Sequence, residues 1–305
     1  MAEDLVYGRE YIDKITFVAI GIVGTLLALA MSTWHVKALW QESAQSFVEP
    51  WAPILPVMLW RFLALGAGVW AVISMFRVGP GNMEVLMHEE RTMVLLHPVN
   101  FEKFVTFSSW TLLSNILYFA SVIAATILET NGNTIPFWLQ VFEICMFSIA
   151  CGSAFLTATI VRHIILPAVF NSDRDSDFLF TYHEQVMHNF AAIFLAVELV
   201  LVAPTLHPEF ALYGIGMGLV YVSFAYVFAY QGGGYYVYSF IDPRLRYAPI
   251  VMSGLAATIA AFYLAIYVVS HVVHMNALLG AMLIASWVIM IVQFRPTQKA
   301  NQSSS

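Results

Sequence analysis

Residues 137–167 read FWLQVFEICMFSIACGSAFLTATIVRHIILP, and this segment decides the fold class of the chain. Its only acidic residue is Glu143, and no basic residue occurs before Arg162. About 20 apolar residues of helix cross a bilayer core of roughly 30 Å, and a helix satisfies its own backbone polar groups where water is absent. The segment therefore predicts a transmembrane helix.

Seven further apolar stretches fill most of the remaining sequence. The eight predicted spans comprise residues 15–31, 53–76, 104–128, 137–167, 187–202, 212–230, 248–269 and 275–294. Of the 305 residues, 60% are hydrophobic and 10% are charged, whereas soluble domains are roughly half apolar and about a quarter charged. We therefore predict an all-α fold, a polytopic transmembrane helical bundle of about eight spans.

The basic residues are distributed unevenly between the two sides that eight spans define. Of the 13 Lys and Arg residues, eleven fall on one side, Lys37 alone falls on the other, and Arg61 lies within the second span. Loops rich in Lys and Arg stay in the cytosol. We therefore predict a cytosolic N-terminus at residues 1–14, a single transmembrane domain at 15–294 and a disordered cytosolic tail at 295–305.

The N-terminal stretch is not typical of a signal peptide. Acidic residues precede the first apolar stretch, and no small-residue cleavage site follows it, so we expect a true span. The net charge of −6 provides no basic surface for nucleic acid, and we predict no nucleic-acid partner.

Polar side chains are costly inside membrane helices and therefore mark either helix contacts or functional sites. Several gather near the predicted cytosolic ends of their spans: Thr106 and Ser109, Arg162 and His163, His183, His188 and Asn189, and the run from Gly234 through Tyr235 and Tyr236 to Tyr238. We expect one layer of the membrane to hold hydroxyls, imidazoles and phenols together.

Each of these residues also has a structural interpretation. A threonine such as Thr106 commonly bonds the carbonyl four residues earlier, and His188 suits a hydrogen bond between helices. We place His183 in a solvated loop and interpret the Gly-Tyr run as a turn followed by interfacial aromatic residues. Arg61 and Glu198 are predicted to pair, because an unpaired charge at that depth is unfavourable.

Metal and haem sites receive little support from the histidines. The spacing of His271 and His274 is a weak signal, and the sequence contains no facing pair in mid-helix that would hold a b-type haem. A zinc site formed by His163, His183 and His188 is conceivable but lacks a ligand motif. We predict neither a metal nor another cofactor.

Three motifs, in this order, resemble the androgen-induced and androgen-dependent transmembrane hydrolases. Residues 103–107, KFVTF, are similar to the family's Lys-Phe-Leu-Thr-Phe. Met187 and His188 open a helix that later carries Glu198, as in the family, and residues 234–240, GYYVYSF, are similar to its Gly-x-Trp-Val-Tyr-Pro-Phe.

The resemblance covers about residues 56–265 and also has departures. Residues 59–62, LWRF, look like the Tyr-Arg-Phe helix of the related Rolling stone group. Ser239 replaces the family's proline and Tyr236 its tryptophan, and the chain has more spans than the family's six.

By this resemblance, the chain would cleave lipid esters of the type formed by a fatty acid and a hydroxy fatty acid. The resemblance implies Thr106 as the nucleophile and His188 as its base, a logic that suits the weak nucleophilicity of a threonine hydroxyl. Ser109, Tyr235, Tyr238 and Asn189 are candidates for stabilising the oxyanion or positioning the substrate. No third member of a catalytic triad is evident, and Asn189 and Glu184 are the two candidates for orienting the imidazole. The expected partners are membrane lipids and the lipid ester, in the endoplasmic reticulum or the plasma membrane.

Two other classes of function remain open. The Rolling stone resemblance implies a non-enzymatic role in adhesion, fusion or regulation, in which the polar residues only hold helices together. A transporter is the third possibility, although the sequence lacks the inverted repeats of many carriers.

Overall fold

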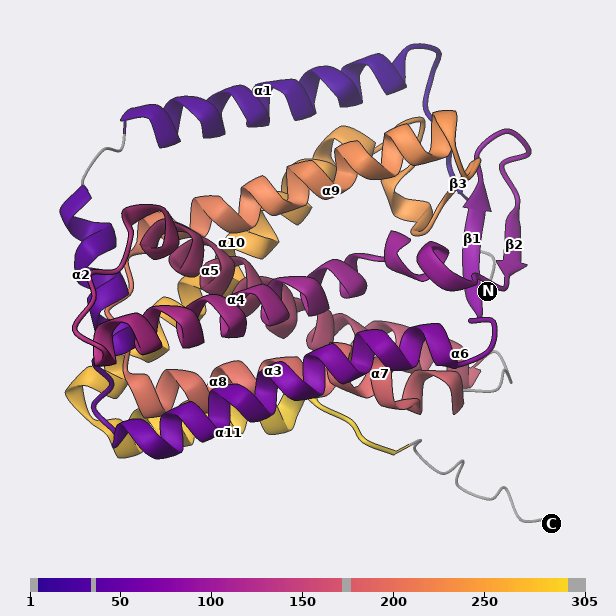
Figure 1. Ribbon diagram of the computed structural model, residues 1–305. Coiled ribbons are helices and arrows are strands. Elements are labelled where there is room, and N and C mark those ends of the chain that lie inside the picture. Colours follow the sequence, from indigo (N-terminus) through magenta and orange to yellow (C-terminus); the bar gives the residue numbers. More distant parts are fainter. Residues whose placement is uncertain (1–4, 34–36, 172–176, 296–305) are drawn as a thin grey trace.

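Figure 1 shows the computed structural model, which describes residues 5–33, 37–171 and 177–295. Most of the predicted disordered tail at 295–305 lies outside the described residues. The longer helices are α1 (Ile12–Thr33), α3 (Ile54–Arg77), α4 (Phe107–Thr130), α5 (Phe137–Ile160), α8 (Ala191–Val202), α9 (Ala211–Gln231), α10 (Ala248–Met275) and α11 (Ala277–Ile291).

Two of these helices are extended by π-helical turns at the same end of the bundle. α5 continues through η2 (Val161–Ile165) into α6 (Leu166–Asn171), and α7 (Tyr182–Gln185) continues through η4 (Val186–Phe190) into α8. Within the described residues, seven helical segments are long and apolar enough to cross a membrane. The prediction of an all-α polytopic bundle is confirmed, and the chain is a multi-pass membrane protein.

The eighth predicted span is shorter than the sequence indicated. We expected residues 275–294, whereas α11 comprises Ala277–Ile291 and the chain is extended from Val292 onward. Asn276 separates α10 from α11, because its backbone is extended and its side-chain oxygen accepts a hydrogen bond from Leu279 N at 3.0 Å. At 1.5 Å per residue α11 is about 22 Å long.

The core is formed by the central helices, and the outer helices expose apolar side chains. α5 is the most enclosed, and it approaches α10 so closely that a Cβ at Gly152 would lie 3.3 Å from the carbonyl oxygen of Ile259. On α3, by contrast, Leu55 and Leu59 are 68% and 62% exposed. An apolar exterior of this extent is what a lipid environment requires.

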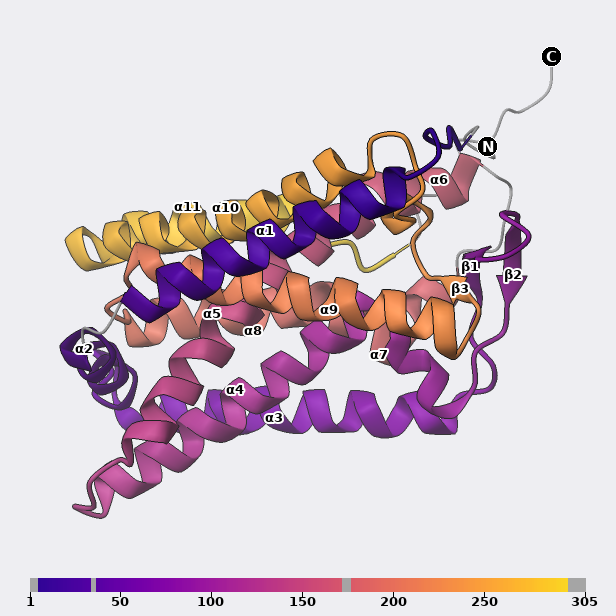
Figure 2. The same ribbon diagram turned by 90° about the horizontal axis from the view of Figure 1, so that it is seen from above.

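A small antiparallel sheet closes one end of the bundle and was not predicted. It consists of β1 (Met83–Met87), β2 (Met93–Leu96) and β3 (Tyr235–Tyr236), in the order β2-β1-β3. β1 pairs with β3 through Leu86–Tyr236 and Met87–Tyr235, which ties the loop after α3 to the loop after α9. Figures 1 and 2 show the sheet at the end opposite to α2 (Lys37–Val48).

The predicted pairing of Arg61 with Glu198 is confirmed in the interior of the bundle, toward the end where α2 lies. Both side chains are fully buried, and Arg61 Nε donates to Glu198 Oε1 at 2.8 Å. The other guanidinium nitrogens donate to Thr126 Oγ1 and to the Phe47 carbonyl, each at 2.7 Å. This arrangement connects α2, α3, α4 and α8.

Candidate functional site

Thr106 lies just before α4, whereas the predicted span at 104–128 placed it inside the helix. A short 3-10 helix, η1 (Asn100–Val105), precedes it, and α4 begins at Phe107. Thr106 is the N-cap residue, and its Oγ1 accepts a hydrogen bond from Ser109 N at 3.2 Å. The expected bond to the carbonyl four residues earlier is replaced by this capping contact, which stabilises the start of the helix.

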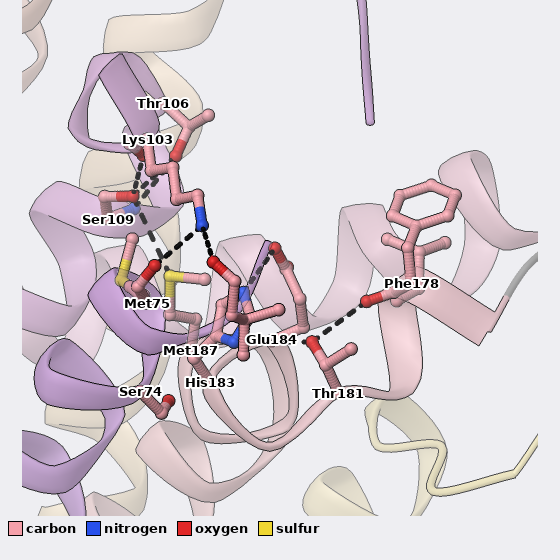
Figure 3. A network of polar contacts seen from close by, with 12 residues as sticks. Ser74, Met75, Lys103, Thr106, Ser109, Phe178, Thr181, His183, Glu184 and Met187 are labelled. Atoms are coloured by element: carbon pink, nitrogen blue, oxygen red, sulfur yellow. Dashed lines mark hydrogen bonds and ion pairs between the residues drawn. The ribbon is translucent and has the colours of Figure 1, made fainter. Parts of the chain in front are cut away.

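The Thr106 hydroxyl is also paired with the hydroxyl of Ser109, at 2.8 Å. Ser109 is fully buried, and its Oγ donates to the Lys103 carbonyl at 2.7 Å. Because a serine hydroxyl has a single proton, Thr106 is the donor of the pair. Ser109 Oγ also lies 3.8 Å from Met187 Sδ, which brings the hydroxyl pair against the helix that carries His188 (Figure 3).

Lys103 fastens the end of α3 to the start of α4. Its buried ammonium donates to the carbonyls of Met75, Val78 and Gly79 at 2.6, 3.0 and 2.9 Å. Burial lowers the pKa of Lys103, and the nearby carboxyl of Glu184 opposes that change. The side chain thereby satisfies carbonyls that the end of a helix leaves without partners.

His188 lies in the π-helical turn η4 and is buried. Its Nδ1 is 3.3 Å from Glu184 Oε2, but the two groups are not aligned for a hydrogen bond. Among the described residues, Thr106 hydrogen-bonds to Ser109 and not to His188. Met187, the neighbour of His188 in sequence, is the residue that connects the two candidates.

The prediction that His183 lies in a solvated loop is wrong. The helix begins at Tyr182, five residues before the predicted start of the span, and His183 lies buried within its first turn. His183 Nε2 is 3.7 Å from Glu184 Oε1. Figure 3 shows His183 and Glu184 in the same group of side chains as Met187.

Of the two candidate tyrosines, Tyr238 reaches the start of α4 and Tyr235 does not. Tyr238 Oη accepts a hydrogen bond from Phe107 N at 3.2 Å, directly beside Thr106. Tyr235 lies in β3 and packs edge-on against Phe228, with ring centroids 5.1 Å apart. Burial raises the pKa of each phenol to about 12.

Asn189 holds the segment that follows α11. Its Nδ2 donates to the Gln293 carbonyl at 2.8 Å, and its Oδ1 accepts from Gln293 N at 3.0 Å. Arg162 donates to the Val292 carbonyl, and His163 Nε2 lies 3.1 Å from the Met290 carbonyl oxygen. These three polar residues therefore have a structural role at the end of α11.

A small cavity borders His188 on the side of α11. Its lining comprises Val161, Arg162, Leu166, Leu179, Phe180, Gln185, His188, Asn189 and Gln293. The lining includes neither Thr106 nor Ser109. His188 and Asn189 are thus the candidate residues that line this cavity, whereas the hydroxyl pair lies at the start of the neighbouring helix.

Metal binding gains no support from the geometry. In the part of the chain that the structure describes, no three His, Cys, Asp or Glu side chains are grouped so that they could hold a metal ion. His163 is occupied at the end of α11, away from the arrangement that the zinc alternative requires.

Sequence reasoning underestimated Lys103, Tyr221 and Glu184. Tyr221 Oη donates to the Val105 carbonyl at 3.0 Å and so supports the turn before Thr106. Glu184 stands four residues before His188, a spacing that places two side chains on one helix face. The spacing is informative only if both residues lie in the helix, and the predicted span began at residue 187 and left Glu184 outside it.

Comparison of the chain with protein-family models, with curated proteins and with solved structures finds no match. The resemblance to the hydrolases therefore rests on the sequence motifs, and the chemistry has to be argued from the geometry of the side chains.

Proposed function

We propose that this chain is an integral membrane hydrolase of lipid esters, with Thr106 as the nucleophile and His188 as the base. One observation carries the proposal. The Thr106–Ser109 hydroxyl pair packs against Met187, next to His188, at the end of a bundle whose exterior is apolar. A hydroxyl and an imidazole on neighbouring helices are the groups that acyl transfer requires.

The reaction follows from the roles of these groups. His188 removes the proton from the Thr106 hydroxyl while Thr106 Oγ1 attacks the ester carbonyl. The tetrahedral intermediate then collapses, the alcohol leaves with the proton from His188, and an acyl-threonine remains. Water, deprotonated by His188, then attacks the acyl carbonyl. The bond between the acyl carbon and Thr106 Oγ1 breaks, Thr106 Oγ1 takes the proton back from His188, and the fatty acid is released.

The start of α4 offers electrostatic support for the oxyanion. The N-terminus of a helix carries partial positive charge and presents backbone N–H groups. The Tyr238 phenol lies at the same place and is a further donor. The Ser109 hydroxyl lies there too, but it donates to the Lys103 carbonyl and would have to release that carbonyl to donate to the oxyanion. In the ground state Thr106 donates to Ser109, so catalysis requires its hydroxyl to exchange this partner for His188.

The experiment has to separate the capping role of Thr106 from nucleophilic catalysis. Asparagine is as good an N-cap residue as threonine but lacks a hydroxyl. We expect Thr106→Asn to abolish hydrolysis of a fatty acid ester of a hydroxy fatty acid in detergent micelles without lowering the Tm. His188→Gln should reduce kcat by about 100-fold or more. Thr106→Ser should retain activity.

The matched control is Ser114→Ala, which removes a buried hydroxyl from the same helix. Among the described residues, Ser114 Oγ bonds only the carbonyl of Trp110, at 2.9 Å, and its loss should leave turnover unchanged. A fluorophosphonate probe should label the wild type and not Thr106→Asn. Labelling that persists in that variant would contradict the proposal, and a protein that hydrolyses no lipid ester would favour the non-enzymatic alternative.

We also propose that the end of the bundle that carries the sheet faces the cytosol, in the endoplasmic reticulum or the plasma membrane. The elements that bear most of the basic residues lie at this end in Figure 1, and Lys37 begins α2 at the other end. A membrane-impermeant thiol reagent should label Glu90→Cys only after cells are permeabilised. Asn133→Cys, in the turn between α4 and α5, should be labelled in intact cells if the protein lies in the plasma membrane. In the endoplasmic reticulum it should stay unlabelled when only the plasma membrane is permeabilised.

A further inference from the structure

The carboxyl group of Glu184 lies between two imidazoles. Its Oε2 is 3.3 Å from His188 Nδ1, and its Oε1 is 3.7 Å from His183 Nε2. The Glu184 side chain is only 23% exposed, and both rings are buried. One acidic group therefore faces two histidines within a single helical segment, at the end of the bundle where Thr106 lies.

We infer that Glu184 is the positioning residue that fixes the orientation and tautomer of the His188 ring. This inference rests on the proposed function for its kinetic consequence, but not for its structural one. A carboxylate beside Nδ1 favours the tautomer that carries its proton on Nδ1. Nε2 is then left with a free lone pair, which is the atom that a general base uses.

Asn189, the other residue considered for this role, is engaged elsewhere. All three of its hydrogen bonds go to Gln185 and to the backbone of Gln293. Glu184, in contrast, is four residues before His188, and the π-helical turn η4 begins between the two. The 3.3 Å separation without alignment fits a contact that tightens when substrate binds, as catalytic hydrogen bonds often do.

His183 competes with His188 for the same carboxyl group. It also lies near Thr181, whose Oγ1 is 3.4 Å from His183 Nδ1, and it interacts electrostatically with Lys103. Lys103 itself is held by three carbonyls and cannot move to Glu184 without leaving them unsatisfied. When the His183 imidazole is removed, the Glu184 carboxyl group should therefore interact with the His188 imidazole alone.

The tautomer can be measured directly. Nitrogen-15 NMR of histidine-labelled protein in micelles distinguishes a ring protonated on Nδ1 from one protonated on Nε2, and the His188→Gln spectrum assigns the His188 signals. We expect wild-type His188 to carry its proton on Nδ1. Glu184→Gln should change that signal to a mixture of tautomers, and His183→Gln should leave it on Nδ1.

Kinetics supply the second measurement. Glu184→Gln should lower kcat by about 100-fold with KM within about twofold of the wild type. Glu184→Asp should recover part of the loss, and His183→Gln should keep kcat. Glu90→Gln, an exposed acidic residue in the sheet turn at the same end of the bundle, is the matched control and should have no effect.

The two failures are distinguishable. An active wild type in which Glu184→Gln keeps both its kcat and the His188 tautomer would overturn the inference and leave the proposed function standing. A wild type without hydrolase activity would overturn the proposed function. In that case an Nε2-protonated His188 would overturn the placement of Glu184 as well, and an Nδ1-protonated ring that depends on Glu184 would support it.

Discussion

Two glutamates on one continuous helical segment have opposite surroundings. Glu198, in the bundle interior toward the α2 end, is fully buried, and its Oε1 accepts hydrogen bonds from Arg61 Nε at 2.8 Å and from Tyr118 Oη at 3.0 Å. Glu184, fourteen residues earlier and about 21 Å away along a straight helix, faces two imidazoles at 3.3 and 3.7 Å without an aligned hydrogen bond.

The difference separates a region whose polar groups stabilise the fold, around Glu198, from a region whose polar groups remain available for chemistry, around Glu184. Around Glu198, a guanidinium, a phenol and a threonine hydroxyl are engaged with one another across several helices. A charged group whose partner is removed in such a place has no water to replace it. Around Glu184, by contrast, His188 Nδ1 has no hydrogen-bond partner among the described residues, so this ring keeps hydrogen-bonding capacity that the folded protein does not use.

The largest effect should follow from breaking the central network. Arg61→Met leaves Glu198 as an uncompensated buried charge, and loss of one partner of a buried ion pair costs about 3–5 kcal/mol. Thermal unfolding in detergent should show a large fall in Tm. The double variant Arg61→Met, Glu198→Leu should recover part of the loss, and a single variant as stable as the wild type would refute the stabilising role of the network.

Lys103 provides an intermediate case at the end of the bundle. Lys103→Met deprives the carbonyls of Met75, Val78 and Gly79 of a charged donor, and we expect a loss of about 2 kcal/mol of folding free energy. Chemical unfolding in mixed micelles measures it. Lys14→Met, an exposed lysine of α1, should change stability little. Equal effects of the two substitutions would mean that the Lys103 contacts contribute nothing.

A smaller effect is expected at Thr106, where stability and activity should separate. Thr106→Ala removes the N-cap of α4 and should cost about 1 kcal/mol, whereas Thr106→Asn should cost much less. Both should be inactive if Thr106 is the nucleophile. Comparison of Tm with turnover tests this point, and an active Thr106→Ala would return Thr106 to a purely structural role.

The smallest expected effect is a pH dependence at the sheet. Burial, followed by the Arg244 charge, lowers the pKa of His88 from its ordinary value of 6.5, and its Nδ1 lies 3.0 Å from Tyr236 Oη. The unfolded chain therefore binds a proton that the folded chain resists, so stability is present above about pH 6.5 and falls as the pH drops below it. His88→Gln should reduce this dependence in Tm measurements between pH 7 and pH 5, and an unchanged slope would contradict the assignment.

The apolar stretches of the sequence predicted most of the architecture. The second predicted span, 53–76, is α3 at Ile54–Arg77 within one residue at each end. The pairing of Arg61 with Glu198 was also predictable, because each of these charged residues had few oppositely charged partners available at that depth in the membrane. Local composition is sufficient here, since a helix in lipid satisfies its own backbone whatever its neighbours are.

The sequence was less informative where a residue's environment depends on distant parts of the chain. His183 was expected in a loop because polar residues surround it, yet the helix begins before it, α7 packs against α3, and the side chain is buried. The three-stranded sheet joins loops that are separated by more than a hundred residues, and no local sequence pattern predicts such a pairing.

The sequence by itself determined that the chain forms a bundle of apolar helices, that charges are scarce within it, and that Thr106 and His188 lie toward the same end. Only the tertiary structure decided that Thr106 caps α4 and bonds Ser109, that Asn189 holds the segment after α11, and that Glu184 lies beside His188. The reason is physical. Partitioning into lipid is a sum over the residues of one segment, whereas hydrogen-bond partners depend on the relative rotation and depth of helices that the chain brings together from far apart.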